Sequence, residues 1–160
     1  MLKLADIPRL TPDWWKYLGE SVCNQIRDRV QKKHQNVFQS SFQKYSKNYA
    51  KKKSAGKAKP KGYSQESYSA TPDMTLSGKM MHDLKVDDRA IQPDSVTIGW
   101  LGIEANKVTE LNRRKNYQIV DLHGDNPLSQ KETEFVLSNF EKGIDKKIKA
   151  YCAETINIGK

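Results

Sequence analysis

Hydrophobic residues near the amino terminus recur every three or four positions and predict a long amphipathic helix. Thr11, Pro12 and Asp13 mark its start, because Thr caps a helix, Pro tolerates its first position and Asp complements its dipole. The stripe runs to about Lys33, and its members are Trp15, Leu18, Val22, Ile26 and Val30. We expect this helix either to pack on a sheet or to face a neighbouring subunit.

A second long helix is predicted near the carboxyl terminus. Ser129 stands three residues before Glu132, which is the capping box that opens many helices. Apolar residues then continue at helical spacing, namely Phe135 or Val136, Phe140, Ile144, Ile148 and Tyr151. A shorter helix of about ten residues is indicated earlier in the chain by Ile103, Lys107, Val108 and Leu111.

Two runs in the middle of the chain alternate between apolar and polar positions, with apolar residues at Leu84 and Val86 and then at Val96, Ile98 and Trp100. Residues 88–94 separate these runs, so we expect antiparallel neighbours across a long loop. Residues 117–122 predict a third strand inside the sheet, because both faces are partly apolar. The sequence therefore predicts an α+β fold: a mainly antiparallel sheet of three or more strands flanked by long N- and C-terminal helices, with a long basic loop.

The charge of the chain is concentrated in one stretch. Its 160 residues fit a single domain, 1–160, and the net charge is +9. Residues 44–62 carry eight lysines and no acidic residue. The wider segment 44–73 contains no Val, Ile, Leu or Met and is interrupted by Gly, Pro and Ser. We therefore predict that 44–73 is a mobile Lys- and Tyr-rich loop inserted in the domain.

This basic loop is the candidate interaction site. Tyrosines interleaved with lysines suit phosphate contact and base stacking, and they also suit docking on an acidic protein surface. A solvated loop without a partner is the plainest alternative. The candidate contact residues are Lys44, Tyr45, Lys47, Tyr49, Lys51, Lys52, Lys53, Lys57, Lys59 and Lys61.

Signatures of catalysis are missing from the sequence. Ser77, Gly78 and Lys79 lack the earlier glycine of a phosphate loop, so we expect Ser77 and Gly78 to form a structural turn. Cys23 and Cys152 have no ligand partner at metal-binding spacing, which is typical of buried thiols on helices. We therefore expect no enzyme activity, no cofactor and no metal site.

Two histidines lie near carboxylates in the sequence and could in principle form acid-base pairs with them. His82 is next to Asp83, but adjacent residues on a strand point to opposite faces, which places this pair poorly for proton transfer. His123 lies near Asp125, and we interpret both histidines as surface or structural residues.

The chain shows no sign of membrane insertion. Its start lacks a signal segment, and no apolar run approaches the roughly 20 residues that cross a bilayer. We expect a protein made in the cytoplasm, with no membrane contact.

Three segments together resemble the tail-completion or virion-morphogenesis proteins of tailed bacteriophages. The segments are FQKYSKNYAKKK at 42–53, DMTLSGKMMHDLKV at 73–86 and SVTIGW at 95–100. They are similar to a family pattern of F-x-x-Y-S-x-x-Y-A-x-x-K, a leucine followed by Ser-Gly and a hydrophobe, and a strand ending in V-x-I-G. The resemblance covers roughly residues 38 to 132, and after Trp100 only Gly124, Pro127, Leu128 and Ser129 align.

The resemblance implies a non-enzymatic virion protein of the phage neck or tail end, made in the host cytoplasm. A completion protein, a tail terminator and a head-tail connector all remain open. It implies a homo-oligomeric ring with heterologous contacts, next to other neck, portal-adaptor or tail proteins and to DNA in the channel. The basic loop would order on assembly. The alternative is a nucleic-acid-binding module that uses the same loop.

Overall fold

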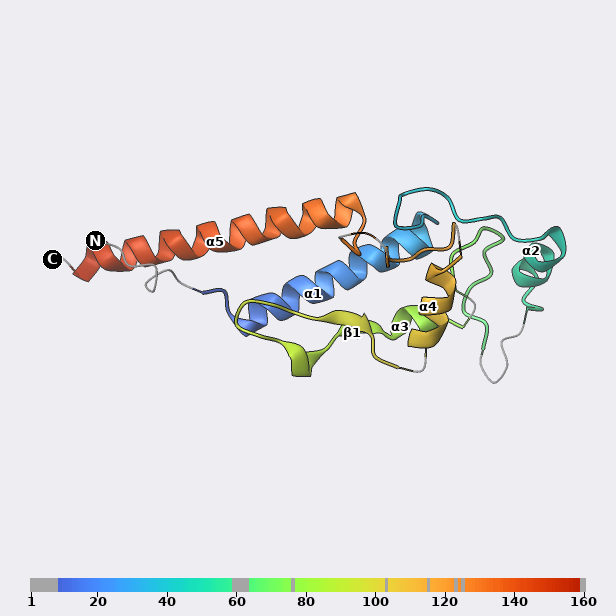
Figure 1. Ribbon diagram of the computed structural model, residues 1–160, viewed down its shortest axis with the longest axis horizontal. Helices are drawn as coiled ribbons and strands as arrows, with labels where there is room; N and C mark the ends of the chain where they lie inside the picture. Colours follow the sequence, from blue (N-terminus) through green and yellow to red (C-terminus); the bar gives the residue numbers. More distant parts are fainter. Residues whose placement is uncertain are drawn as a thin grey trace.

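The computed structural model describes residues 9–158 apart from 59–63, Leu76, Ile103, Lys115, His123 and Asp125, with side chains as far as Tyr151. The molecule is elongated, with two long helices side by side, a short strand pair against one of them and a small helix at the far end (Figure 1). In chain order the elements are α1 (Pro12–Arg27), the π-helical turn η2 (Asp28–Lys32), α2 (Lys47–Ser54), α3 (Lys79–His82), β1 (Leu84–Val86), the 3-10 turn η3 (Asp88–Ala90), β2 (Ile98–Trp100), α4 (Ala105–Asn112) and α5 (Gln130–Ile158).

The amino-terminal helix forms as its sequence predicts. Thr11 Oγ1 accepts a hydrogen bond from Trp14 N at 3.3 Å, and η2 carries the helix on to Lys32. The predicted stripe is buried, and its most deeply buried members are Leu18, Val22, Ile26 and Val30. Helix α1 therefore lies at the centre of the hydrophobic core.

Strands β1 and β2 form the predicted antiparallel pair, with Leu84 opposite Trp100 and Val86 opposite Ile98. Leu84 and Val86 are buried, whereas Lys85 between them is exposed. Among the described residues this two-stranded sheet is the only sheet, so the predicted sheet of three or more strands is wrong. The chain is mainly helical, and its strands form one hairpin instead of a layer.

The segment 117–122, predicted as a third strand, is irregular. Helix α4 forms where a short helix is predicted, and the Oδ1 atom of Asn112 at its end accepts hydrogen bonds from Ile119 N and Val120 N at 2.5 and 3.1 Å. The carbonyl of Ile119 accepts a bond from Arg29 at 2.7 Å. Side chains thus pair backbone groups that a neighbouring strand would otherwise pair, and Ile119 is still fully buried.

The last helix opens with the predicted capping box. Ser129 N donates to Glu132 Oε2 at 2.8 Å, and Glu132 N donates to Ser129 Oγ at 3.4 Å. The Glu132 carboxylate also pairs with Arg29 of η2 at 2.7 Å, and both side chains are buried. This ion pair ties the start of α5 to the end of the first helix.

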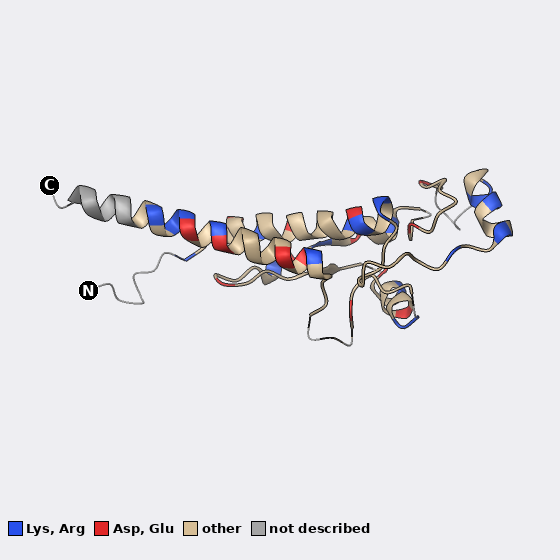
Figure 2. Ribbon diagram, turned by 90° about the horizontal axis from the view of Figure 1, so that it is seen from above, with Lys and Arg blue, Asp and Glu red and all other residues tan. Residues whose placement is uncertain are grey.

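The middle of α5 packs on the first turn of α1. A Cβ atom on Gly143 would lie 2.8 Å from the Trp14 ring, so only glycine permits this approach. The Phe140 ring lies 6.3 Å from that of Trp14 and 5.9 Å from that of Trp15. Past Gly143, α5 continues beyond the start of α1 and leaves the body of the molecule (Figures 1 and 2).

Candidate functional site

Residues 47–54 of the predicted loop form helix α2 at one end of the molecule. Ser46 Oγ caps this helix by accepting a hydrogen bond from Tyr49 N at 3.3 Å. An eight-residue helix rich in lysine is not stable by itself in water. Its position therefore depends on the contacts that hold it.

A buried ion pair holds α2 in place. The Lys53 side chain is fully buried, and its ammonium group pairs with Asp73, at the far end of the predicted loop. The Tyr45 hydroxyl lies 3.3 Å from Lys53 Nζ, and the Tyr45 ring centroid lies 5.0 Å from it. Asp73 also accepts hydrogen bonds from Ser67 Oγ and, at 3.0 Å, from Thr75 N. We call Tyr45, Lys53, Ser67 and Asp73 the Lys53 anchor.

The loop that follows α2 packs back on the anchor. Gln65 Nε2 donates to the carbonyls of Lys53 and Ser67 at 2.6 and 2.8 Å. Burial, and next the nearby Asp73 carboxylate, raise the pKa of Tyr45, so its hydroxyl stays protonated and can donate to Asp73. The described part of 44–73 is thus joined by specific contacts. The prediction that this segment is mobile in the free protein stays a prediction.

The remaining lysines of the described segment point outward. Lys44, Lys47, Lys51, Lys52 and Lys57 are exposed. The charge-coloured ribbon shows the basic residues of α2 at the opposite end from the α5 terminus (Figure 2). These five side chains form what we call the basic face.

Three of the predicted contact residues face inward instead. The Lys53 charge is buried and paired with Asp73 within the chain, so partner contact through Lys53 stays a prediction. Tyr45 and Tyr49 are half-buried, with ring centroids 4.8 Å apart in an edge-to-face pair, and base stacking on them stays a prediction. Lys59 and Lys61 lie outside the described residues.

Ser77 and Gly78 lie next to the anchor. Gly78 has a φ of 70°, which favours glycine, and it precedes α3. A Cβ atom there would lie 1.7 Å from the Glu66 carboxylate, so a side chain would push the Glu66 side chain aside and would also be strained by the positive φ. A cleft of about 220 Å³ runs from this turn past Tyr49 to Leu111 of α4.

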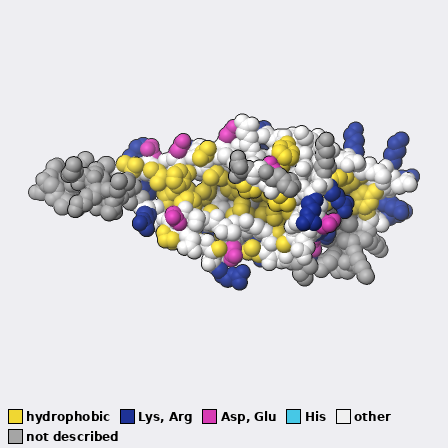
Figure 3. All heavy atoms as spheres, viewed as in Figure 1, with side chains coloured by type: hydrophobic (Ala, Val, Ile, Leu, Met, Phe, Trp, Pro, Cys, Tyr) yellow, Lys and Arg dark blue, Asp and Glu magenta, His cyan; other side chains and the backbone are white. Residues whose placement is uncertain are grey.

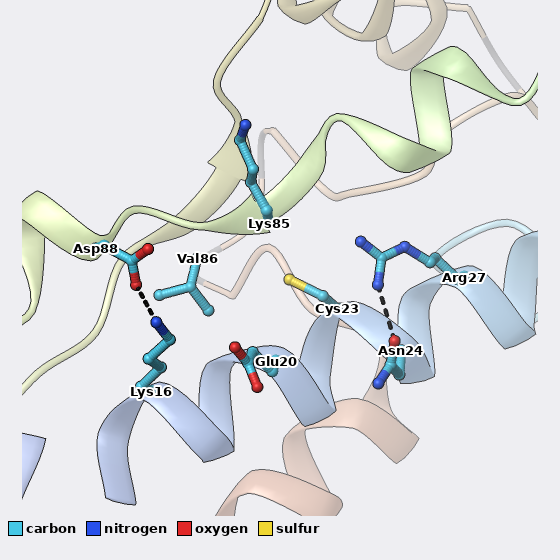
Figure 4. A pocket seen from close by; sticks show the side chains of 8 residues that line it. All are labelled: Lys16, Glu20, Cys23, Asn24, Arg27, Lys85, Val86 and Asp88. Atoms are coloured by element: carbon cyan, nitrogen blue, oxygen red, sulfur yellow. Dashed lines mark hydrogen bonds and ion pairs between the residues drawn. The ribbon is translucent and has the colours of Figure 1, made fainter. Parts of the chain in front are cut away.

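A polar pocket of about 350 Å³ lies between α1 and the hairpin (Figure 4). Lys16 and Asp88 pair across it at 2.8 Å, and Arg27 donates to the Met81 carbonyl at 3.0 Å. Burial raises the pKa of the Cys23 thiol to about 11, so the thiol is protonated and a weak nucleophile at neutral pH. These groups join α1 to the hairpin.

The other residues considered for catalysis or metal binding do not form a site together in the described part of the chain. His82 is exposed, and its Nε2 lies 3.7 Å from the Glu66 carboxylate. Cys23 is a buried free thiol, as predicted. His123, Asp125 and the side chain of Cys152 lie outside the described residues.

An apolar stripe on α5 is exposed to solvent. Leu137 is 56% exposed and Ile148 is 44% exposed, and they lie three helical turns apart. In the space-filling view, hydrophobic side chains form a band along the middle of the molecule (Figure 3).

Sequence reasoning missed the anchor, although a signal for it exists. Tyr45, Tyr49 and Lys53 are spaced four residues apart, and residues at this spacing lie on the same face of a helix. The number of lysines in this stretch does not distinguish Lys53, which is buried, from the neighbouring lysines, which are exposed. Asp73 gives no local signal, because it lies 20 residues from Lys53 in the chain.

Comparisons with protein-family models, curated proteins and solved structures found no match to the chain. Among the described residues, no three His, Cys, Asp or Glu side chains gather in a way that could hold a metal ion. No helix in the described part of the chain is both long and apolar enough to span a membrane.

Proposed function

We propose that this chain is a structural component of the neck or tail end of a tailed bacteriophage. It completes the tail or joins it to the head as one copy in a ring, and its basic face docks on a neighbouring component during assembly. Support comes from the resemblance of three sequence segments and from the unit that these segments build.

The observation that carries this proposal is the structural role of the resembling residues. In the first segment, Tyr45 and Lys53 belong to the Lys53 anchor, and Ser46 caps α2. Phe42 of the same segment is buried in the core. The second segment begins with Asp73, the partner of Lys53. A sequence resemblance is stronger support when the matching residues contact one another in the structure than when they lie far apart.

The physical logic of the anchor fits a docking role. Burying an ammonium group costs free energy that only a paired, hydrogen-bonded carboxylate offsets. The chain uses this arrangement to hold a short lysine-rich helix at one end of the molecule. The result is a cationic surface presented in a defined orientation, which suits an acidic partner.

The proposal is tested by electron microscopy of phage particles made without this protein. We expect DNA-filled heads beside unattached or abnormally long tails, and rescue by the unchanged chain supplied separately. Rescue by a Lys47→Glu, Lys51→Glu, Lys52→Glu variant should fail, whereas a Lys33→Glu, Lys85→Glu, Lys131→Glu variant, which reverses three exposed lysines elsewhere on the molecule, should succeed. Normal infectious particles without the protein would overturn the proposal.

A second candidate function is nucleic-acid binding through the basic face, favoured by five exposed lysines without an acidic neighbour between 44 and 62. Log affinity for duplex DNA should then fall with log salt by about 0.9 per phosphate contact. Changing Lys47, Lys51 and Lys52 to Gln should reduce this slope, whereas the same change at Lys131, Lys142 and Lys146 should not. Equal slopes for both variants would reject this function.

A further inference from the structure

An apolar groove of about 320 Å³ lies between α1, the second arm of the hairpin and the start of α5. Its walls include Trp15, Leu18 and Val22 of α1, Val96 before β2, and Leu128 and Val136 on the α5 side. Asp94 and Ser95 stand at its hairpin side and are exposed. The groove is thus a hydrophobic hollow with a carboxylate at one side.

The same molecule carries partly exposed apolar side chains at the far end of α5. Residues 144–158 of α5, here called the α5 extension, continue past Gly143, where the helix meets the first turn of α1. Ile144 and Ile148 fall on one side of this extension by helical spacing. Ile148 is 44% exposed.

The groove and the α5 extension cannot meet within one chain. Val136 in the groove wall and Ile148 on the extension belong to the same continuous helix, and 12 residues of helix span about 18 Å. A helix does not bend back on itself, so the extension always points away from its own groove. Contact between the two surfaces therefore requires a second copy of the chain.

Charge favours the same pairing. Residues 144–149 contain three lysines and one aspartate, so this part of the extension is cationic. Asp94 lies at the hairpin side of the groove and is exposed, so this rim is anionic. Opposite charges around a hydrophobic centre steer association and set its orientation.

We propose that the α5 extension of one copy fills the apolar groove of another. This inference rests on the proposed function as an assembly component and names the joint between its copies. Each chain carries both halves of the joint, so contacts pass from copy to copy and close into a ring or a reciprocal dimer.

Sedimentation measured over a range of protein concentrations tests the joint. The unchanged protein should associate as concentration rises. Ile148→Ser should remain monomeric because it removes the apolar side chain that enters the groove, and Ser95→Trp should remain monomeric because the tryptophan fills the groove. Lys142→Ser, on the opposite side of the same helix, should associate as the unchanged protein does. Circular dichroism confirms folding of each variant, and Asp94→Lys replaces Ser95→Trp if the tryptophan prevents folding.

Mixing the two monomeric variants gives the decisive result. The Ile148→Ser chain keeps an open groove and the groove-blocked chain keeps its extension, so an equal mixture should form a heterodimer and nothing larger. A mixture that stays monomeric, association of either variant alone, or an unchanged protein that is monomeric throughout would overturn the joint. Failure here together with defective particles would leave the proposed function standing, because the particle phenotype does not depend on which surfaces meet.

Discussion

At the scale of single residues, two buried ion pairs decide how this molecule holds together. Arg29 and Glu132 join η2 to α5, and Lys53 and Asp73 join α2 to the returning loop. Each pair is buried and supported by further hydrogen bonds, which a paired charge needs in a low dielectric. Removing one partner is therefore costlier than removing an exposed charge.

Lys53→Met should lower the free energy of unfolding by about 3 kcal/mol, because it leaves the Asp73 carboxylate buried without its cation. Chemical denaturation followed by circular dichroism measures this loss. Lys52→Met, which removes an exposed neighbour on the same helix, should change stability by less than about 0.5 kcal/mol. Equal effects of the two changes would contradict the buried ion pair.

The Cys23 thiol should make stability depend on pH in the alkaline range. Burial raises its pKa from 9.0 to about 11, so between these pH values the unfolded chain has lost a proton that the folded chain keeps. Stability contributed by this group is complete below pH 9 and is lost as pH rises towards 11. The expected loss is about 2 to 3 kcal/mol, since one pKa unit corresponds to about 1.4 kcal/mol.

Urea denaturation at pH 8 to 11 of the unchanged protein and of Cys23→Ala isolates this contribution. The difference in unfolding free energy between the two proteins should shrink as pH rises, because only the unchanged protein carries the titrating thiol. Parallel pH curves would show that the thiol is not protected by burial.

At the scale of elements, a side chain takes the place of a neighbouring strand. Asn112 at the end of α4 accepts the amides of Ile119 and Val120, and this segment passes through the core without joining the hairpin. The alternating pattern of 117–122 is real, but the partner strand that would use it is absent from the described part of the chain. Asn112 and Arg29 thus bond the backbone of this segment from outside any sheet.

Asn112→Ala should destabilise the protein by about 2 to 4 kcal/mol, because two backbone amides lose their acceptor and one of them is fully buried. Hydrogen exchange should show faster exchange at Ile119 and Val120 than in the unchanged protein. Asn106→Ala, at an exposed position of the same helix, serves as the control and should leave both amides protected. Unchanged exchange rates in the Asn112 variant would mean that other contacts protect the Ile119 and Val120 amides.

At the scale of the whole molecule, the two surfaces proposed for assembly lie at opposite ends. The basic face is at the end formed by α2, and the α5 extension projects from the other end (Figure 1). An elongated subunit of this kind can bind a neighbouring copy and a different component at the same time. The two contacts can therefore be disrupted separately.

Assembly should protect the basic face from protease. Lys57 is exposed just after α2, so trypsin should cleave there in the free protein. In assembled particles we expect cleavage after Lys57 to slow at least tenfold, as measured by mass spectrometry of the peptides. Equal rates in free and assembled protein would argue against docking through this face.

Local signals in the sequence determined much of the framework. The stripe of α1 with its Thr11 cap, the capping box of Ser129 and Glu132, helix α4 and the antiparallel hairpin were all predictable. Each depends on residues close in the chain, whose spacing and hydrogen bonds favour one local conformation whatever surrounds them.

Tertiary structure alone decided the rest. Whether 117–122 becomes a strand depends on Asn112 and Arg29, and whether Lys53 faces solvent depends on Asp73. Arg29 and Glu132 are 103 residues apart, and no local pattern links them. A lysine in a basic run has the same composition whether it is buried or exposed, and only the fold, by bringing a carboxylate to it, makes burial stable.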